Sequence, residues 1–439
     1  MKTVITYGTY DLLHYGHIRL LERAKALGDY LIVAVTSDDF DRTRGKINVQ
    51  QSLAERVAAV RETGLADQII VEEYEGQKID DIKRYGVDIF TVGSDWVGKF
   101  DYLNEYCKVV YLERTEGVSS SDIRSKNREL KMGLIGETPN YLNKIQQEDK
   151  YVNGVEITGI CTEDVTKFND NIQKLDIVTK DYKELIEKTD AVYIKSEQEQ
   201  HYEHVKEALS KKKSVLCESP IALNEKQCKE LFEIAKKNNC VLMDAIRTAY
   251  STAYSRLLLL VKSGKIGNVV SIEATCTNMK YKDRSKSLLD WGANALLPIF
   301  QILGTNYKDK TIITKYKDKV KKEDYYTQIN FLYDNTTATI KVAENAKSEG
   351  SLIITGTEGY VYVPAPWWKM DYFEIRYENQ ENNKRYFYQL DGEGIRYELV
   401  AFARASQDGK TNYSYVTEEE SIAICKVMED YLSGDVVEI

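Results

Sequence analysis

Two histidine pairs have a spacing that suits chemistry. The chain has only four histidines: His14 and His17 stand in HYGH, and His201 and His204 stand in HYEH. The first pair follows a predicted strand and opens a predicted helix, on which residues three apart share a face. A helix N-terminus offers free N–H groups and a positive dipole end, which suit a triphosphate. Two imidazoles there can donate hydrogen bonds to phosphate oxygens as negative charge develops in a transition state. The spacing alone is also compatible with a chance pattern on an amphipathic helix.

A second phosphate-binding pattern follows a later predicted strand. It is the run RTEGVSSS at 114–121, which precedes a predicted helix at 121–130. An arginine fork beside a hydroxyl-rich helix start makes a cradle for phosphate. A plain helix cap would explain the serines but not the Arg-Thr-Glu-Gly sequence at a strand end. The two patterns together favour a nucleotide triphosphate as ligand.

Three motifs in order carry a family resemblance. HYGH preceded by GTYDLLH, GSDWVGKFD at 93–101 and RTEGVSSS at 114–121 resemble the glycerol-phosphate cytidylyltransferases of the HxGH nucleotidyltransferase family. The similarity covers about residues 1–128. It implies transfer of CMP from CTP to glycerol phosphate, or to a related polyol phosphate, with release of pyrophosphate. The CDP-polyol would serve synthesis of a bacterial surface polysaccharide or a teichoic-acid-like polymer. Mg²⁺ would arrive with CTP, and no metal site held by the protein alone is implied.

The resemblance also assigns roles to residues that match the family motifs. The implied CTP site consists of Thr9, Tyr10, His14, His17, Lys46, Arg114, Thr115, Glu116, Gly117, Val118, Ser119, Ser120 and Ser121. The residues expected to carry catalysis are His14, His17, Lys46 and Arg114.

Two further basic residues are expected to contact the acceptor phosphate. They are Arg44, in the loop after the second strand, and Lys78, in EGQKIDD. Solvated surface charge is the alternative for both, and for Lys46. The family usually has lysine where Arg44 stands, and arginine binds phosphate with a planar fork instead. Gly64 occupies a position where relatives often have arginine, which leaves part of the base or phosphate site undefined.

Residues 131–439 resemble the Gfo/Idh/MocA oxidoreductases, but three of the family's motifs are altered. The stretches that match include AVYIKSEQEQHYEHVKEAL, SVLCESPIALN and YELVAFARASQDGK. The motif E-K-P reads Glu218-Ser219-Pro220, which replaces the catalytic lysine. The motif D-x-G-x-H ends in Asn294 instead of histidine, and the glycine-rich loop at 136–141 keeps only Gly136. A side chain at 138 and a tyrosine at 141 hinder the approach of pyrophosphate.

These losses make NAD(P) binding doubtful and favour a non-catalytic role for this part of the chain. That role is oligomerisation, binding of a sugar or polyol phosphate, or contact with the next enzyme. The alternative is a bifunctional enzyme in which this part reduces a keto-polyol phosphate with NAD(P)H before cytidylyl transfer. A scaffold in which the N-terminal domain is also inactive is disfavoured, because HYGH and RTEGVSSS are intact. For HYEH, we expect histidines that are satisfied by internal contacts.

The order of strand-like and helix-like segments predicts an α/β protein of three domains. Alternating strands and helices over 1–128 indicate a Rossmann-like cytidylyltransferase domain with a parallel sheet. The alternation restarts over 131–250, which predicts a second, degenerate Rossmann-type domain. Long alternating strands over 251–439 predict an α+β domain of the Gfo/Idh/MocA type with a mostly antiparallel sheet.

Composition excludes several classes of protein. The 439 residues have a net charge of −9, and neither the first 130 residues (−4) nor the remainder (−5) is basic. Nucleic-acid binding relies on clustered lysine and arginine, so it is excluded as a general function. The longest apolar run is LLLLV at 257–261, too short to cross a bilayer. The first residues lack the pattern of a signal peptide, and the seven cysteines are scattered without CxxC spacing. We therefore expect a cytoplasmic protein, and the two resemblances imply a homo-oligomer.

Overall fold

The computed structural model describes residues 2–43, 49–74, 76–113, 130–152, 154–279, 286–388, 390–408 and 414–439. These residues form two compact units. The first lies within 1–127 and includes the short segment 150–153, and the second lies within 128–149 and 154–439. The domain boundaries at 128 and 250 stay predictions.

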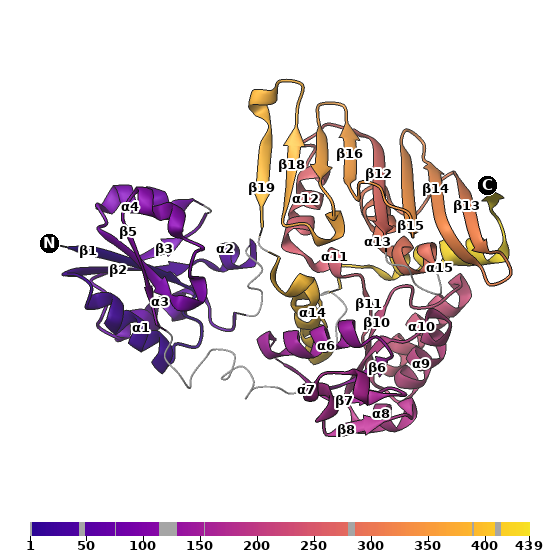
Figure 1. Ribbon diagram of the computed structural model, residues 1–439, viewed down its shortest axis with the longest axis horizontal. Coiled ribbons are helices and arrows are strands. Elements are labelled where there is room, and N and C mark those ends of the chain that lie inside the picture. Colours follow the sequence, from indigo (N-terminus) through magenta and orange to yellow (C-terminus); the bar gives the residue numbers. More distant parts are fainter. Residues whose placement is uncertain are drawn as a thin grey trace. The chain divides into compact units, whose positions relative to one another are not determined.

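The first unit contains a parallel sheet between two layers of helices. In the described residues, its strands are β1 (Thr3–Gly8), β2 (Tyr30–Thr36), β3 (Gln68–Glu72), β4 (Ile89–Gly93) and β5 (Lys108–Leu112). Its helices are α1 (Tyr15–Lys25), α2 (Asp38–Thr43), α3 (Leu53–Glu62) and α4 (Gln77–Tyr85). Helices α1 and α3 cover one face of the sheet and α4 covers the other (Figure 1), and their apolar side chains join two separate core clusters. Both faces are therefore buried, which explains the nearly continuous apolar runs of the strands.

The strand order creates a natural ligand site in this unit. The order is β3-β2-β1-β4-β5, so the chain builds outward from β1 in one direction and then in the other. In open parallel sheets, ligands bind beyond the carboxyl ends of the strands where the order reverses. That point lies between β1 and β4, and the HYGH sequence directly follows β1.

The second unit begins with another parallel sheet, in the order β11-β10-β9-β6-β7-β8. Its strands are β6 (Leu130–Gly136), β7 (Val155–Cys161), β8 (Ile177–Thr179), β9 (Ala191–Lys195), β10 (Ser214–Glu218) and β11 (Leu242–Ala245). Its helices are α6 (Pro139–Glu148), α7 (Asp170–Gln173), α8 (Tyr182–Lys188), α9 (Gln198–Ser210) and α10 (Glu225–Asn238). This is the strand order of dinucleotide-binding folds, and it confirms the predicted second Rossmann-type sheet.

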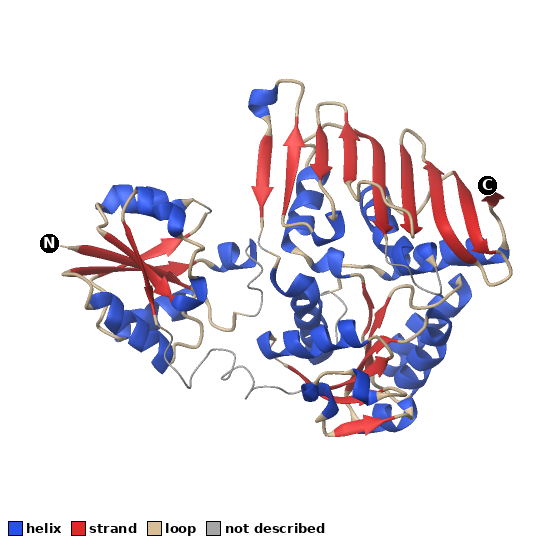
Figure 2. Cartoon of the chain, in the orientation of Figure 1, coloured by secondary structure: helices blue, strands red, loops and turns tan. Residues whose placement is uncertain are grey.

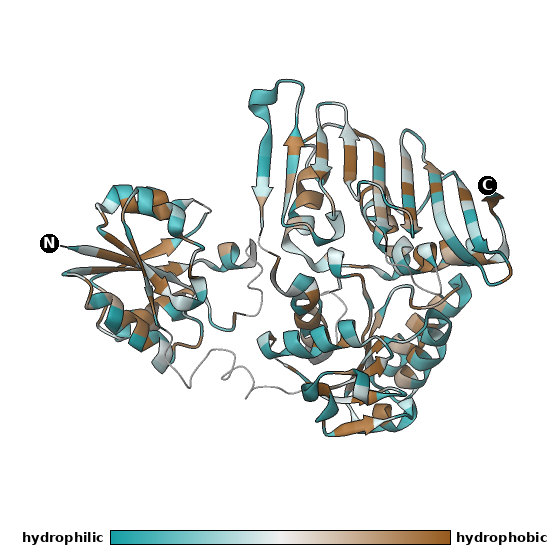
Figure 3. Cartoon of the chain, in the orientation of Figure 1, coloured by the Kyte–Doolittle hydropathy of each residue, from teal (hydrophilic) through white to brown (hydrophobic). Residues whose placement is uncertain are grey.

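A nine-stranded sheet follows, in the order β19-β18-β17-β16-β12-β15-β14-β13-β20 (Figure 2). The strands are β12 (Val269–Asn278), β13 (Asp309–Asp318), β14 (Glu323–Leu332), β15 (Thr337–Glu344), β16 (Leu352–Gly356), β17 (Tyr360–Val363), β18 (Tyr372–Arg376), β19 (Lys384–Phe387) and β20 (Val437–Glu438). The β12–β15 and β13–β20 pairs are parallel and the other pairs are antiparallel, so the mostly antiparallel sheet is confirmed. The edge strand β19 is strongly hydrophilic (Figure 3), which limits pairing with other chains.

Helices complete the second unit. They are α11 (Arg247–Tyr250), α12 (Thr252–Lys262), α13 (Ser287–Leu303), α14 (Ile395–Asp408) and α15 (Glu418–Ser433). The last one starts at a capping box, in which Thr417 and Glu420 satisfy each other's backbone N–H groups, and it ends at Gly434. Among the residues that the structure describes, no helix has the length and hydrophobicity needed to cross a membrane.

Candidate functional site

The turn after β1 places the first histidine pair at the start of α1. Tyr10 (φ 54°) and Leu12 (φ 50°) adopt left-handed backbone conformations, which non-glycine residues rarely use. His14 is the N-cap of α1, with an extended backbone, and its Nδ1 accepts a hydrogen bond from the Gly16 N–H at 3.0 Å. His14 therefore directly precedes the helix, and His17 lies in its first turn. The two imidazoles nevertheless stack, with centroids 4.0 Å apart and planes at 25°, so they do form one surface.

The cap determines what His14 can offer a ligand. Because Nδ1 accepts a hydrogen bond, the neutral ring carries its proton on Nε2, and Nε2 becomes a hydrogen-bond donor. The same contact uses one of the N–H groups at the helix start. Tyr10 packs edge-on against His17, with centroids 5.6 Å apart. Tyr10 is 2% exposed, and burial raises the pKa of its phenol above the ordinary value. The Tyr10 ring therefore packs in the core of this unit, beside His17.

A buried arginine on α3 holds this turn in place. Arg56 follows a capping box between Ser52 and Glu55 at the start of α3, and its side chain is fully buried. Its guanidinium bonds to five groups: the carbonyl oxygens of Thr9 (2.7 Å), Thr36 (2.9 Å) and Gln51 (3.1 Å), and the carboxylates of Asp38 and Asp41. Arg56 thus ties the turn after β1 to the end of β2, and a planar five-donor fork suits that task.

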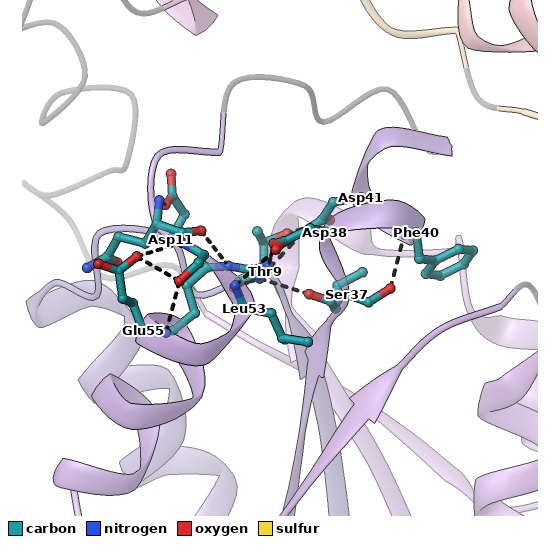
Figure 4. Close-up of polar contacts among 12 residues, drawn as sticks. Thr9, Asp11, Ser37, Asp38, Phe40, Asp41, Leu53 and Glu55 are labelled. Carbon is teal, nitrogen blue, oxygen red and sulfur yellow. Dashed lines mark hydrogen bonds and ion pairs between the residues drawn. The ribbon is translucent and has the colours of Figure 1, made fainter.

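The carboxylates near the histidine pair are bonded to the protein. Figure 4 shows Thr9 meeting Asp41, whose Oδ1 accepts a hydrogen bond from the Thr9 hydroxyl at 3.0 Å. Asp11 accepts hydrogen bonds from the backbone N–H groups of Gln50 and Gln51 at 3.0–3.1 Å. In the described part of the chain, no three histidine, cysteine or acidic side chains group as a metal site.

Lys78 lies at a small pocket beyond the carboxyl ends of the strands. It is buried, forms an ion pair with Glu72, and places its Nζ 4.7 Å from the centre of the Tyr7 ring. The pocket holds about 60 Å³ and is lined by Tyr7, Gly8, Thr36, Glu72, Lys78, Val92, Trp96 and Phe100. Lys78 is thus not a solvated surface charge, and it stands at the switch point of the sheet.

An open groove of about 580 Å³ adjoins the other side of the histidine-bearing turn. It is lined by Leu12, Leu13, Ile18, Gln51, Ala59, Glu62 and Thr63. Thr63 directly precedes Gly64. The remaining predicted site residues, namely Arg44, Lys46 and 114–121, lie outside the described residues.

Sequence reasoning missed Arg56, Asp38 and Asp41 as residues that build the site. The sequence does contain a pattern that indicates a buried, ion-paired arginine at this position. Leu53, Val57 and Val60 form the apolar face of α3, and Arg56 lies on that face, where a charge must have partners. The acidic run DDFD directly after β2 supplies them.

In the second unit, the altered motif positions make structural hydrogen bonds. The Ser219 hydroxyl donates to Asp244 at 3.2 Å, and Asn294 accepts a hydrogen bond from the Thr248 hydroxyl at 3.2 Å. The ring nitrogens of His201 lie 2.8 Å from the Pro220 carbonyl oxygen and 3.0 Å from that of Ser196.

The second histidine of the HYEH pair, His204, also has an internal hydrogen-bond partner. His204 Nδ1 lies 2.9 Å from the Ser196 hydroxyl, and burial lowers the pKa of His204 to about 4. Internal contacts therefore occupy the HYEH pair, which agrees with the expectation from the sequence.

Comparison with known proteins matches each unit to a family. Residues 5–126 match a cytidylyltransferase-like family model, and residues 130–245 match a model of an oxidoreductase family with an NAD-binding Rossmann fold. Glycerol-3-phosphate cytidylyltransferase of Bacillus spizizenii is 49% identical over 124 residues, which cover 28% of this chain and 95% of the relative. The enzyme of the same name from Staphylococcus aureus is 48% identical over 126 residues, which cover 29% and 95%.

Solved structures resemble the second unit in fold. KijD10, a 3-ketoreductase from Actinomadura kijaniata solved with NADP and TDP-benzene, aligns with a TM-score of 0.63 at 17% identity. The alignment covers 71% of this chain and 99% of that one. An NAD binding oxidoreductase from Klebsiella pneumoniae aligns with a TM-score of 0.58, also at 17% identity, over 68% of this chain and 95% of that one.

Proposed function

The chain belongs, through its first unit, to the cytidylyltransferase family that includes glycerol-3-phosphate cytidylyltransferase, and on this premise we propose its substrates. The first unit transfers CMP from CTP to the phosphate of glycerol phosphate, or of a closely related polyol phosphate, and releases pyrophosphate. The observation that carries this proposal is the stacked His14–His17 pair at a helix start, beside the switch point of a parallel sheet.

The chemistry is a direct displacement at phosphorus. An oxygen of the acceptor phosphate attacks the α-phosphorus of CTP, a P–O bond forms, and the bond to the pyrophosphate oxygen breaks. No protein nucleophile is needed, so positioning and charge stabilisation carry the catalysis. His14 Nε2–H and His17 donate hydrogen bonds to phosphate oxygens whose charge increases in the transition state.

The other predicted residues divide between the two substrates. Lys46 and residues 114–121 bind the triphosphate, with Arg114 as the charged donor among them. Arg44 and Lys78 bind the acceptor phosphate. Support for Lys78 is its position in the pocket between the ends of β1, β3 and β4. Thr9 and Tyr10 contact CTP.

Mg²⁺ accompanies CTP in this proposal and neutralises triphosphate charge. The carboxylates beside the histidine pair fit a metal ion that is bound mainly through the triphosphate better than a metal ion that is held by the protein alone. Asp11, Asp38 and Asp41 already accept hydrogen bonds or ion pairs from Arg56, Thr9 and backbone amides. Mg²⁺ commonly binds through substrate phosphates and one or two carboxylates.

We propose further that the second unit does not perform the hydride transfer typical of its fold. In support, serine and asparagine stand at the lysine and histidine positions, and both make structural hydrogen bonds. The alternative remains a reductase that supplies the polyol phosphate from a keto precursor. Homo-oligomerisation, a cytoplasmic location and use of the CDP-polyol in a surface polymer complete the proposal.

Pyrophosphate release tests the proposed reaction. The full chain is incubated with CTP, Mg²⁺ and, in separate reactions, glycerol 3-phosphate, glycerol 2-phosphate and longer polyol phosphates. We expect release with one of these acceptors and little with ATP or UTP in place of CTP. The matched control is His17→Ala, expected to be slower by about 10²–10³. No release with any polyol phosphate would contradict the proposal.

A further inference from the structure

The dinucleotide crevice of the second unit would lie at the switch point of its sheet, between β6 and β9. A bound dinucleotide places its pyrophosphate at the start of the first helix, its adenosine ribose beside the second strand and its nicotinamide toward the opposite side of the sheet. In this chain, those places correspond to the start of α6, the end of β7, and the ends of β9 and β10.

Glu137 occupies the adenosine side. It directly follows β6, and its Oε2 accepts a hydrogen bond from the Thr162 hydroxyl at 2.8 Å. Its Oε1 accepts another from the backbone N–H of Glu163, also at 2.8 Å. Thr162 and Glu163 directly follow β7, where the ribose-binding acid of such folds stands. A carboxylate of the chain thus takes the hydrogen-bond donors of this side and adds negative charge beside the pyrophosphate position.

Tyr141 occupies the nicotinamide side. It stands in the first turn of α6, at the third small-residue position of the glycine-rich loop, and its hydroxyl donates to the Glu218 carboxylate at the end of β10. That hydroxyl also lies 3.1 Å from the hydroxyl of Tyr193 on β9. Lys195 Nζ lies 5.4 Å from the centre of the Tyr141 ring, and Arg247 Cζ lies 4.7 Å from it. The ring thus lies near two cations, one at the end of β9 and one at the start of α11.

The protonation states favour this arrangement. Burial raises the pKa of Tyr141 well above its ordinary value, so the phenol keeps its proton and donates. Despite burial, the cations of Lys195 and Arg247 hold the pKa of Glu218 below its ordinary value, so the carboxylate accepts. Hydrogen bonds to a charged acceptor are stronger than those between neutral groups, so displacing the Tyr141 hydroxyl is costly.

The start of α6 is also altered at the pyrophosphate position. Pro139 is the first residue of the helix and has no N–H to donate. The glycine that remains, Gly136, has a packing role: a Cβ there would lie 2.3 Å from the carbonyl oxygen of Lys195 on the neighbouring strand. The close approach of β6 and β9 is therefore sufficient to require glycine at 136 without a bound phosphate.

We propose that the chain's own Glu137 and Tyr141 occupy the dinucleotide crevice, so that the second unit folds and works without NAD(P). The fold is thereby preserved while the cofactor site is closed from both sides. This inference deepens the proposal that the second unit does not transfer hydride. Its test measures NAD(P)H binding and not turnover. A failure of this inference is therefore distinguishable from a failure of the proposal that the second unit does not transfer hydride.

The experiment titrates NADPH and NADH into the full chain and follows binding by calorimetry and by nicotinamide fluorescence. We expect no saturable binding up to about 1 mM, an affinity weaker than about −4 kcal/mol. Saturable binding of either dinucleotide at micromolar concentration to the unaltered chain would overturn the proposal without any variant.

A variant that reopens the crevice tests the assigned side chains. Glu137→Gly with Tyr141→Ala restores small residues at both positions, and we expect NADPH affinity to rise at least about tenfold above that of the unaltered chain. Tyr141→Phe is the matched control, since it removes the hydroxyl and keeps the ring, and we expect it to bind NADPH less tightly than the double variant. Pyrophosphate release and circular dichroism verify that each variant is folded. A folded double variant that still fails to bind NADPH would overturn the assignment of these two side chains as the obstruction.

Discussion

His14 has two separable tasks, and substitution can remove them one at a time. Its Nδ1 caps α1 through the Gly16 N–H, while Nε2–H is the group that we propose as a donor to phosphate. In His14→Ala both tasks are lost. In His14→Asn the side-chain oxygen takes the place of Nδ1, but the amide is too short to reach the position of Nε2. We therefore expect His14→Asn to restore the cap and not the reaction.

The two effects have different magnitudes. Loss of an N-cap side chain costs about 1 kcal/mol of helix stability. Loss of a transition-state donor costs about 10²–10³ in kcat, or about 2.7–4 kcal/mol. Hydrogen exchange of the α1 amides, read by mass spectrometry, should therefore speed up about fivefold in His14→Ala and little in His14→Asn. The rate of pyrophosphate release should fall by about 10²–10³ in both.

The reciprocal variant completes the test. His14→Gln is long enough to place an amide N–H near the position of Nε2, and it leaves the cap position empty. We expect faster exchange in α1 together with a rate above that of His14→Ala. A rate near that of the unaltered chain in His14→Asn would refute the role of Nε2–H as a donor, and equal exchange in the alanine and asparagine variants would refute the cap.

Three other predictions concern groups around the two sites. Arg56→Met should lower the free energy of unfolding of the first unit by about 3–5 kcal/mol in urea, because it leaves the buried Asp41 carboxylate without its cation. Arg61→Met, on the exposed side of α3, is the control and should have little effect. Lys78→Met is made together with Glu72→Gln, so that no buried charge is left unpaired. This double variant should raise KM for the acceptor phosphate about 10–100-fold and leave KM for CTP nearly unchanged. Equal changes in both KM values would contradict an acceptor site at Lys78. Burial raises the pKa of Asp244 to about 7, so the folded second unit binds a proton that the unfolded chain releases, and its stability should fall as pH rises from about 4 to about 7. Asp244→Asn should flatten that dependence in thermal unfolding, and an unchanged slope would mean that another group is responsible.

The sequence predicted the layers of the protein well, because periodicity reports burial. Apolar runs such as TVITYG and AVYIKS indicate strands of the parallel sheets, because these strands are buried on both faces. The exceptions have local causes. The lysines and aspartates of β13 mask the alternation of that strand, and SLIITGTEGYVYVP, which alternates like a single strand, is the hairpin of β16 and β17.

The candidate sites were predicted less completely, because their key contacts join residues distant in sequence. The HYGH motif was visible, but the cap formed by His14 depends on the left-handed turn at Tyr10 and Leu12. Likewise, the loss of the glycine-rich loop was evident from the residues at 136–141. The hydrogen bond from Tyr141 to Glu218 spans 77 positions and is set by the parallel register of the sheet. Motifs thus indicated where chemistry takes place, while packing determined which groups remain available for it.

The central claim is that this chain joins CMP to a polyol phosphate. The most direct measurement supplies CTP labelled at its α-phosphorus, together with glycerol 3-phosphate and Mg²⁺, and follows the label by chromatography and mass spectrometry. We predict that the label appears in CDP-glycerol, or in the CDP-polyol of a better acceptor, and that the pyrophosphate released is unlabelled. Label that stays in CTP, or appears only as free CMP, with every polyol phosphate would contradict the claim.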